Sequence, residues 1–175
     1  MHDECFHFFF NDLNLSISKS VYDLWLKFRQ MNHNDTEACG VLIGTKDFAS
    51  NHYCIESVTV PMSKDIRTKY SFTMKDPRHQ QIVDKAYLDS NGTSIYLGTW
   101  HSHPQAIPIP SHIDYQDWQR CLKRNPDRSL FFIIIGLEQI KIVIYMNDKF
   151  IENMSVKLKE GRLPENDTEL VISTR

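Results

Sequence analysis

The hydrophobic residues of the chain fall into short runs or alternate with polar residues, and this pattern predicts strands. Seven segments share it: residues 5–10, 13–18, 37–44, 52–60, 94–103, 129–136 and 139–147. Gly40 and Gly44 interrupt the apolar run of the third segment, so we expect a neighbouring backbone to approach it closely. Residues 61–75 are polar and predict a connection that becomes extended near residues 70–72.

Three other segments place apolar residues three or four positions apart, which is the spacing of a helix with one buried face. They cover residues 18–31, 76–90 and 111–125. Ser18 and Asp76 stand where helix N-caps are expected, and Pro77 suits a first helical position. The pair Asn91-Gly92 marks the end of the second helix.

The order of these elements predicts a mixed α/β (α+β) sandwich with a central mixed sheet and helices on its faces. A length of 175 residues suits one compact domain with a substantial core. We expect this domain to span residues 1–159. Residues 160–175 are polar and broken by proline, so we expect a tail, of which residues 169–173 could dock onto the domain.

Composition narrows the class of protein further. Hydrophobic residues make up 41% of the chain and charged residues 24%, as in a soluble globular domain. The net charge of −2 predicts no nucleic-acid partner and no anionic membrane partner. The four cysteines form no C-x-x-C pair, which argues against a disulfide framework and a zinc ribbon. The N-terminus lacks the basic region of a secretory signal. No apolar run has the length of about 20 residues that crosses a membrane. We therefore expect a soluble cytoplasmic protein.

The stretch GTWHSHPQAIPIPSHIDYQDW, residues 98–118, carries the candidate chemistry. Side chains of a strand alternate, so His101 and His103 are expected on one face, where both imidazoles can reach one metal ion. A proline-broken loop of seven residues follows, and Ser111 and Asp114 then open the predicted helix. Two histidines and one aspartate leave a fourth position for water, which is typical of a catalytic zinc site.

Each half of this motif also has a purely structural explanation. Ser111 and Asp114 match a capping box, in which both side chains serve backbone N–H groups. A single histidine in a strand is commonly a packed or solvated residue. The two halves at this spacing nevertheless favour the metal site. We expect His112 to point away from Asp114, and Trp118 to pack in the core.

A carboxylate close to the metal could act as a general base towards the attacking water. The residues alone leave four candidates near predicted strand ends, namely Asp35, Glu37, Glu56 and Asp76. Glu37 is also explained as a solvated acid at a strand start, so the pattern alone does not choose the base.

The motif HSH at residues 101–103, followed after seven residues by SHID at 111–114, resembles the zinc signature of JAB/JAMM (MPN+) metallopeptidases. The segment EACGVLIG, residues 37–44, is similar to the strand that carries the catalytic glutamate of that family. The resemblance implies a JAB/MPN-type, cytidine deaminase-like fold and a zinc-dependent isopeptidase or peptidase activity.

The resemblance also implies a role for each residue of the site. It implies Zn²⁺ as the cofactor, with His101, His103 and Asp114 as its ligands. It implies Glu37 as the catalytic base, and it implies that the Ser111 hydroxyl helps to stabilise the tetrahedral oxyanion.

Finer details of the sequence, GTWHSHP, PSHIDYQDW and YSFTMKDPRH, resemble the small JAB proteins of bacterial CBASS antiphage operons. This implies an isopeptidase that releases a cGAS/DncV-like nucleotidyltransferase from targets to which a ubiquitin-like conjugation machinery has joined its C-terminus. In JAB enzymes that release ubiquitin-like modifiers, the modifier's tail pairs with a strand edge, for which residues 67–75 are the candidate here. The linker at residues 123–129 is too short for the zinc-bearing insertion of ubiquitin-chain-specific relatives.

Two other functions stay open on the sequence. A JAB hydrolase that processes a sulfur-carrier or ubiquitin-like protein in a small-molecule pathway would use the same zinc centre. A non-catalytic JAB scaffold, or a DNA-associated one, would need no intact centre. Scaffold members usually lack one or more ligands, whereas this chain keeps all of them.

Overall fold

The computed structural model describes residues 4–10 and 13–158, so the predicted tail and its segment 169–173 lie outside the described residues. The strands are β1 Cys5–Phe10, β2 Leu13–Ser18, β3 Cys39–Asp47, β4 His52–Val58, β5 Ile66–Arg67, β6 Phe72–Thr73, β7 Ile95–Ser102, β8 Leu130–Ile135, β9 Gln139–Met146 and β10 Lys149–Lys157. The helices are α1 Lys19–Lys27, α2 Arg78–Asp89 and α3 His112–Arg124.

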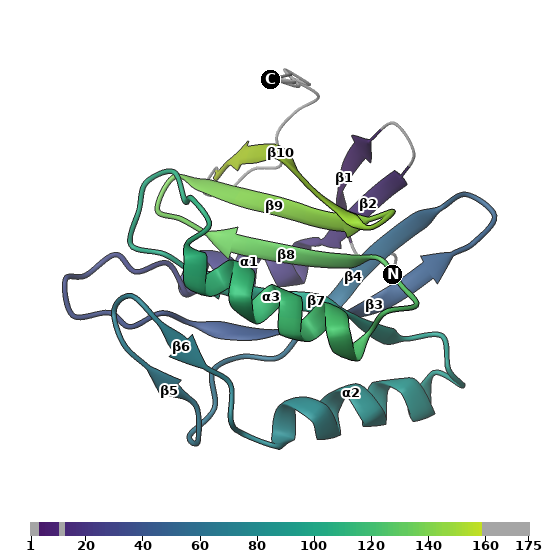
Figure 1. Cartoon of the computed structure of the whole chain (residues 1–175), viewed down its shortest axis with the longest axis horizontal. Coiled ribbons are helices and arrows are strands. Elements are labelled where there is room, and N and C mark those ends of the chain that lie inside the picture. The colour runs from purple at the N-terminus through teal and green to yellow at the C-terminus, as the bar shows by residue number, and fades with distance from the viewer. Residues whose placement is uncertain (1–3, 11–12, 159–175) are drawn as a thin grey trace.

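One mixed sheet organises the molecule. Its strands follow the order β1-β2-β4-β3-β7-β8-β9-β10, and β5 and β6 form a separate hairpin. The pairs β2/β4 and β7/β8 are parallel, and the other neighbours are antiparallel. Figure 1 shows α3 in front of the sheet, α1 behind it and α2 along its lower side. The predicted mixed sheet with helices on its faces is therefore confirmed.

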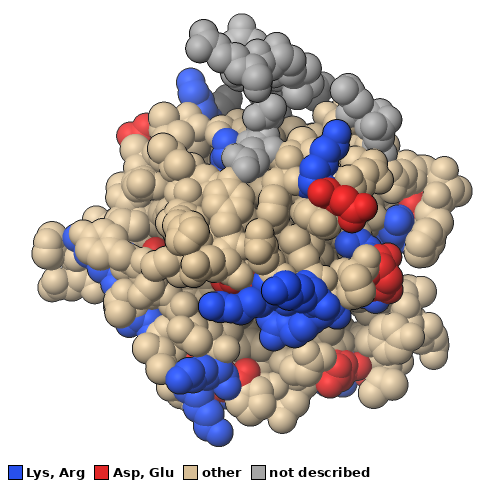
Figure 2. Space-filling view, viewed as in Figure 1, with Lys and Arg blue, Asp and Glu red and all other residues tan. Residues whose placement is uncertain are grey.

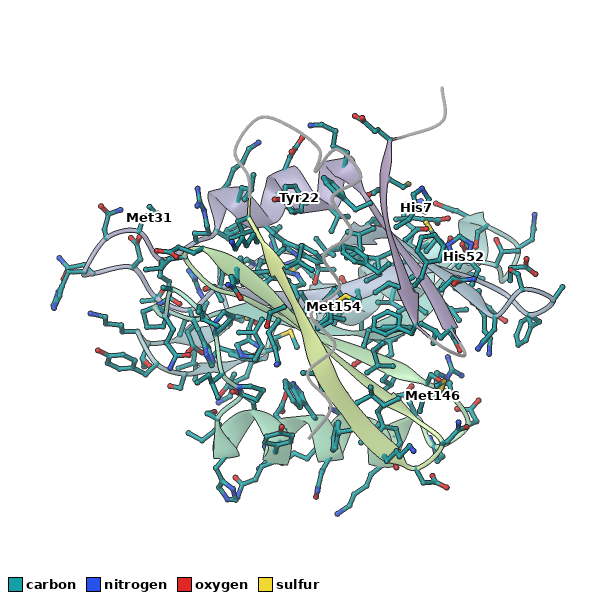
Figure 3. All side chains as sticks on the ribbon, turned by 90° about the horizontal axis from the view of Figure 1, so that it is seen from above. His7, Tyr22, Met31, His52, Met146 and Met154 are labelled. Atoms are coloured by element: carbon teal, nitrogen blue, oxygen red, sulfur yellow. The ribbon has the colours of Figure 1, made fainter. Side chains whose placement is uncertain are left out.

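Apolar clusters lie on both faces of the sheet. On one face, α1 buries Val21 and Trp25 in the larger core, together with the inward side chains of the sheet. On the other face, Trp118 of α3 stacks on Phe132 of β8 with ring centroids 4.8 Å apart. Figure 3, turned by 90°, shows α1 and α3 on the two sides of the sheet. The expected packing role of Trp118 is confirmed, and the sheet is held from both sides by apolar burial.

The predicted helix starts agree closely with the structure. The Ser18 hydroxyl accepts from Val21 N at 3.4 Å, as expected of an N-cap. The second helix begins one residue later than expected, at Arg78 with Pro77 at the N-cap, so the expected cap at Asp76 and the expected first helical position of Pro77 were wrong. The carboxylate of Asp76 still accepts from the Arg78 N–H at 3.1 Å. The first helix, however, ends at Lys27 rather than at Met31. It ends early because Gln30 is buried among hydrogen-bond partners outside the helix, and these contacts outweigh helical continuation.

Strand β10 is the strand of the large sheet that the hydrophobic pattern did not predict, and the short strand β5 was also not predicted. The pairing of β10 with β9 shifts register between Ile151 and Met154, so the apolar residues of β10 do not alternate regularly. The pair Asn147-Asp148 before β10 is a sequence signal for a tight turn. Both residues have positive φ, of 52° and 61°, as in the two-residue turns that connect hairpin strands.

Charged side chains of both signs are scattered over the face drawn in Figure 2, most of which is uncharged. A group of lysine and arginine side chains gathers over α3, where Arg120, Lys123 and Arg124 are exposed. Among the helices that the structure describes, none has the length and apolar character needed to cross a lipid bilayer.

Strand β3 depends on the missing side chain of Gly40. A Cβ atom on Gly40 would overlap the carbonyl oxygen of Thr59 and lie 2.5 Å from Nε1 of Trp100. That indole nitrogen donates to Thr59 O at 2.9 Å in the buried interior. Gly44 is equally close to the carbonyl of Cys54, so the expected close approach at both glycines is confirmed.

We predict that Gly40→Ala lowers the free energy of unfolding by about 2 kcal/mol or more, because the rigid backbone and indole around it cannot move apart without strain. Denaturant unfolding of the metal-free chain measures this change. Ser57→Ala, an exposed substitution on the neighbouring strand β4, serves as the control and should stay within about 0.5 kcal/mol of wild type. An equally small effect at Gly40 would contradict the packing described here.

Candidate metal centre

Pairing between β3 and β7 places the candidate base beside the two histidines. Cys39 lies opposite His101 in this antiparallel pair. β3 begins later than expected, at Cys39, and β7 ends one residue earlier than expected, at Ser102, so Glu37 and His103 lie just beyond the strand ends. The backbone N–H of His103 still donates to Ile135 O at 2.9 Å, which continues the direction of the strand.

The start of α3 brings Asp114 to the same place. The Ser111 hydroxyl accepts from Asp114 N at 3.2 Å, and Ser111 N donates to Oδ2 of Asp114 at 2.6 Å, so the capping box is present. Oδ1 of the same carboxylate lies 3.1 Å from Nε2 of His101. The capping role and the metal-binding role of Asp114 are therefore compatible, because Oδ2 accepts from the backbone N–H of Ser111 and Oδ1 faces the imidazole of His101.

His101, His103 and Asp114 form one buried cluster of ligand atoms. The two Nε2 atoms are 3.1 Å apart, and Nε2 of His103 lies 3.5 Å from Oδ2 of Asp114. One ligand atom of each residue lies within 4.8 Å of the others, and their exposed fractions are 1%, 7% and 5%. Two imidazoles and a carboxylate that converge in this way fit the donor set and ligand number of a catalytic zinc site.

Burial and mutual contact set the protonation of this cluster. Burial lowers the pKa of His101, although the hydrogen bond with Asp114 opposes the change. Burial alone would also lower the pKa of His103, but hydrogen bonding to Asp114 and its charge raise it. The hydrogen bonds of both imidazoles outweigh burial at Asp114 and hold the pKa of its carboxyl well below the usual range. Asp114 is thus ionised, and His101 favours the neutral form that binds metals.

Glu37 is the carboxylate that reaches the cluster. Its Oε1 lies 3.7 Å from Nε2 of His103, and its side chain is buried. Burial raises the pKa of Glu37 to about 8; the charge of His103 opposes this and that of Asp114 adds to it. A carboxyl with a pKa near neutrality can both accept and return a proton, which suits general acid–base chemistry.

The other candidate acids have their contacts elsewhere. Their side-chain partners are local: Asp35 binds Asn32, Glu56 binds Thr45, and Asp76 binds Arg78. His112 is exposed, with Nε2 2.9 Å from Nε2 of Gln116, so it points away from the cluster as expected. Of the four acids that the sequence left open, the structure therefore brings Glu37 to the candidate metal ligands.

Three residues around the cluster were not foreseen from the sequence. The ring of Phe72 in β6 packs on His101 with centroids 5.0 Å apart. Oε1 of Gln105 lies 3.3 Å from Nδ1 of His103 and accepts from the N–H of Ile109 at 2.9 Å. The buried Ser102, between the two histidines, accepts from the N–H of Ala38 at 2.8 Å. The contacts of Phe72 and Ser102 join segments far apart in the chain, so local periodicity carried no signal for them, whereas Gln105 lies only two residues from His103.

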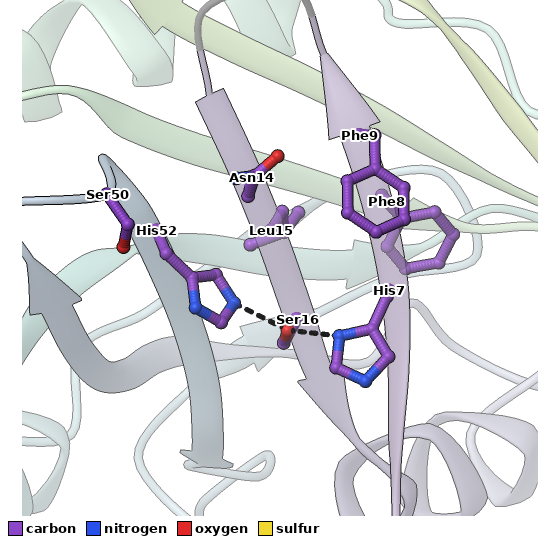
Figure 4. A pocket seen from close by; sticks show the side chains of 8 residues that line it. All are labelled: His7, Phe8, Phe9, Asn14, Leu15, Ser16, Ser50 and His52. Atoms are coloured by element: carbon purple, nitrogen blue, oxygen red, sulfur yellow. Dashed lines mark hydrogen bonds between the residues drawn. The ribbon is translucent and has the colours of Figure 1, made fainter.

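A separate pocket of about 150 Å³ lies across β1, β2 and β4 (Figure 4). At its wall the Ser16 hydroxyl bridges Nδ1 of His7 and Nε2 of His52, at 2.8 and 2.6 Å. The residues that line this pocket include none of the candidate site residues. The metal-ligand cluster is thus distinct from this pocket.

Comparison with known proteins agrees with the geometry. A family model described as prokaryotic homologs of the JAB domain matches residues 18–147. A protein of Vibrio cholerae named CD-NTase/cGAS isopeptidase is 36% identical over 126 residues, covering 72% of this chain and 78% of that protein. A protein of Escherichia coli with the same name is 33% identical over 133 residues, covering 76% of this chain and 80% of its own length.

A solved structure shares the fold. The solution structure of a protein from Desulfitobacterium hafniense superimposes with a TM-score of 0.53 at 28% identity, covering 78% of this chain and 87% of that one. The family model alone spans most of the mixed sheet and all three helices, and both halves of the histidine and aspartate motif lie inside it. The chain therefore belongs to the prokaryotic homologues of the JAB domain, as the resemblance of its motif implied.

Proposed function

We propose that this chain is a zinc-dependent isopeptidase of CBASS antiphage defence. It hydrolyses the bond that joins the C-terminus of a conjugated cGAS/DncV-like nucleotidyltransferase to its target protein, and residues 1–159 form its catalytic domain. The convergence of His101, His103 and Asp114 beside the buried Glu37 carries this proposal. Its substrate class is supported by the name of the Vibrio cholerae relative, a CD-NTase/cGAS isopeptidase.

His101 and His103 would hold the metal through Nε2, and Asp114 would hold it through the carboxylate that the capping box orients. A zinc ion bound there would act as a Lewis acid and would lower the pKa of a water molecule towards about 7. The amide oxygen of Gln105 faces Nδ1 of His103, so it would hold that ring in the tautomer whose Nε2 is free to bind.

Glu37 would move the proton during hydrolysis. As the water oxygen forms a bond with the scissile carbonyl carbon, the Glu37 carboxylate takes the proton of the water. As the bond between that carbon and the lysine nitrogen breaks, Glu37 delivers the proton to the leaving amine. This role is supported by the distance of 3.7 Å between Oε1 of Glu37 and Nε2 of His103, at the edge of the candidate ligand cluster.

Ser111 would stabilise the oxyanion without giving up its cap. In the capping box its oxygen acts as an acceptor for the N–H of Asp114. The hydroxyl proton remains a donor, and a donor is what a developing oxyanion needs. The two roles thus use different parts of one hydroxyl group.

The β5–β6 hairpin is the proposed docking edge for the substrate tail. In the described part of the chain β6 pairs with β5 alone, so its other edge has no strand beside it. Phe72 of β6 contacts the ring of His101, so a tail that pairs with β6 would run towards the ligand cluster. Main-chain pairing of an extended tail supplies affinity, and alternate side-chain pockets supply selectivity.

We predict one zinc per wild-type chain and a large loss of bound zinc in His103→Ala, because removal of one of three protein ligands leaves too few donors. Elemental analysis of the purified, dialysed proteins measures the zinc content. His112→Ala removes an exposed imidazole nearby and should retain the full zinc content. Equal zinc in wild type and His103→Ala would show that the ligands lie elsewhere.

We expect Glu37→Gln to reduce hydrolysis about 10²–10⁴-fold while zinc content and melting temperature stay nearly unchanged, because the amide keeps the shape of the side chain but cannot take the proton. Rates on a cleavable conjugate, together with zinc analysis and thermal unfolding, test this expectation. Glu56→Gln, at an exposed acid, is the matched control. If Glu37→Gln kept more than about a tenth of the wild-type rate, another acid would have to be the base.

The substrate prediction uses two fusions to the same unrelated protein. A fusion through the C-terminal tail of the partner nucleotidyltransferase should be cut at the junction, whereas a ubiquitin fusion should survive, because recognition resides in the tail. Cleavage of the ubiquitin fusion alone would point to a general deubiquitinase-like enzyme. Cleavage of neither would favour a small-molecule hydrolase.

Phe72→Pro should slow cleavage of the nucleotidyltransferase fusion, because proline removes a backbone N–H from the proposed docking edge. Phe72→Leu keeps that N–H and an apolar side chain, so it separates loss of main-chain pairing from loss of the ring. Zinc content should remain at one per chain in both variants. Equal rates for the proline and leucine variants would remove the case for strand pairing at β6.

A further inference from the structure

Gln30 lies three residues after the end of α1, and only 4% of its surface is exposed. Its side-chain amide makes three hydrogen bonds, to partners in three other segments. Oε1 accepts from the Ser102 hydroxyl at 3.1 Å. Nε2 donates to the carbonyl oxygens of Asp35 at 3.2 Å and Lys69 at 2.9 Å. An amide group has two donors, and both are occupied here.

Each of these partners belongs to a segment that carries part of the proposed site. Asp35 lies two residues before Glu37, and Lys69 lies in the turn between β5 and β6. Ser102 separates the two histidine ligands. Gln30 itself touches none of the proposed catalytic groups, so any effect it has on the reaction passes through the segments it joins.

Further hydrogen bonds connect the same three segments around Gln30. The Ser102 hydroxyl accepts from Ala38 N at 2.8 Å while it donates to Gln30, and Ser102 N donates to Ala38 O at 2.9 Å. Glu37 N donates to Thr68 O of the hairpin turn at 2.8 Å. The backbone of Glu37 is therefore held on one side by the strand of histidine ligands and on the other by the hairpin.

A buried network of this kind is sensitive to the loss of any member. When one partner is removed, the remaining donors and acceptors stay buried without hydrogen bonds, which is costly, and the segments move to recover them. Because Gln30 is the residue whose side chain contacts all three segments, its loss should change their relative positions rather than only weaken one of them.

We propose that Gln30 is a positioning residue that holds the Glu37 segment, the β5–β6 hairpin and the histidine strand in one arrangement, so that a tail bound on the hairpin meets the base and the metal ligands in register. This inference rests on the proposed function for its meaning in catalysis. The arrangement of the three segments can be tested without any substrate.

The first test measures hydrogen exchange in the zinc-loaded, full-length protein. Gln30→Met keeps the length of the side chain but removes its donors and acceptor, and Gln81→Met makes the same change at an exposed position on α2. Exchange of the Glu37 amide should become at least about 10-fold faster in Gln30→Met. The amide of Phe132, in the middle of the sheet, reports global unfolding and should not change by the same factor.

The second substitution, Ser102→Ala, removes the hydroxyl that joins Gln30 to Ala38. If the network acts as one unit, the double variant should expose the Glu37 amide no more than the more affected single variant does. If Gln30→Met fails to fold, Ser102→Ala alone should still speed exchange at Glu37. Unchanged exchange at Glu37 in the folded variants, or an equal change at Glu37 and Phe132, would overturn the proposal.

The kinetic test compares two substrates, one with the full tail and one with the tail cut to its last two residues. A residue needed only for folding would reduce kcat/KM for both substrates by the same factor, namely the fraction of folded enzyme. A positioning role predicts that the ratio of full-tail to short-tail kcat/KM falls at least about 5-fold in Gln30→Met and stays unchanged in Gln81→Met. An unchanged ratio would overturn the proposal. A wild-type protein that cuts neither substrate would overturn the proposed function instead, and the hydrogen-exchange result would then decide the role of Gln30.

Discussion

The pairing of β3 with β7 is the constraint on which the rest of the site depends. It brings the segment around Glu37 beside His101 and His103, although more than sixty residues separate them in the sequence. The pairing is possible because Gly40 lets the Thr59 carbonyl and the Trp100 indole approach the strand. Gly98 of β7 lies where the register of this pairing shifts. Its φ is 137°, a conformation that other residues rarely adopt. The geometry of the candidate site therefore depends on this close approach of the backbones.

Asp114 illustrates how helix capping and a ligand set can be built from the same atoms. The N–H of Ser111 holds one carboxylate oxygen, so the other keeps a fixed direction towards His101. A flexible acid at this position would have to lose conformational entropy whenever it bound a metal. The capping box removes most of that cost in advance, since the carboxylate is already ordered by the fold of the helix.

Much of the fold was predictable because its elements follow local periodicity. Seven of the eight strands of the large sheet, the three helices and the cap at Ser18 were expected near their observed places, and the HSH and SHID segments indicated the candidate ligand cluster. The exceptions have tertiary causes. Helix α1 ends early because Gln30 is held by distant segments, and β10 escaped notice because its register shift breaks the alternation. The choice of Glu37 among four acids needed either a family resemblance or the structure, because only the sheet pairing decides which acid is close.

The sequence separations within the site have a consequence for how the protein acquires activity as it folds. His101, His103 and Asp114 lie within 14 consecutive residues, so their contacts close only a short loop of chain. Glu37 must instead find its place across a long loop, after β3 and β7 have paired. Contacts between residues close in sequence cost less loop entropy and tend to form earlier. We therefore expect a newly made chain to be able to bind its metal before it can cut a peptide bond. The folding polypeptide would then pass through a metal-bound but catalytically inactive state.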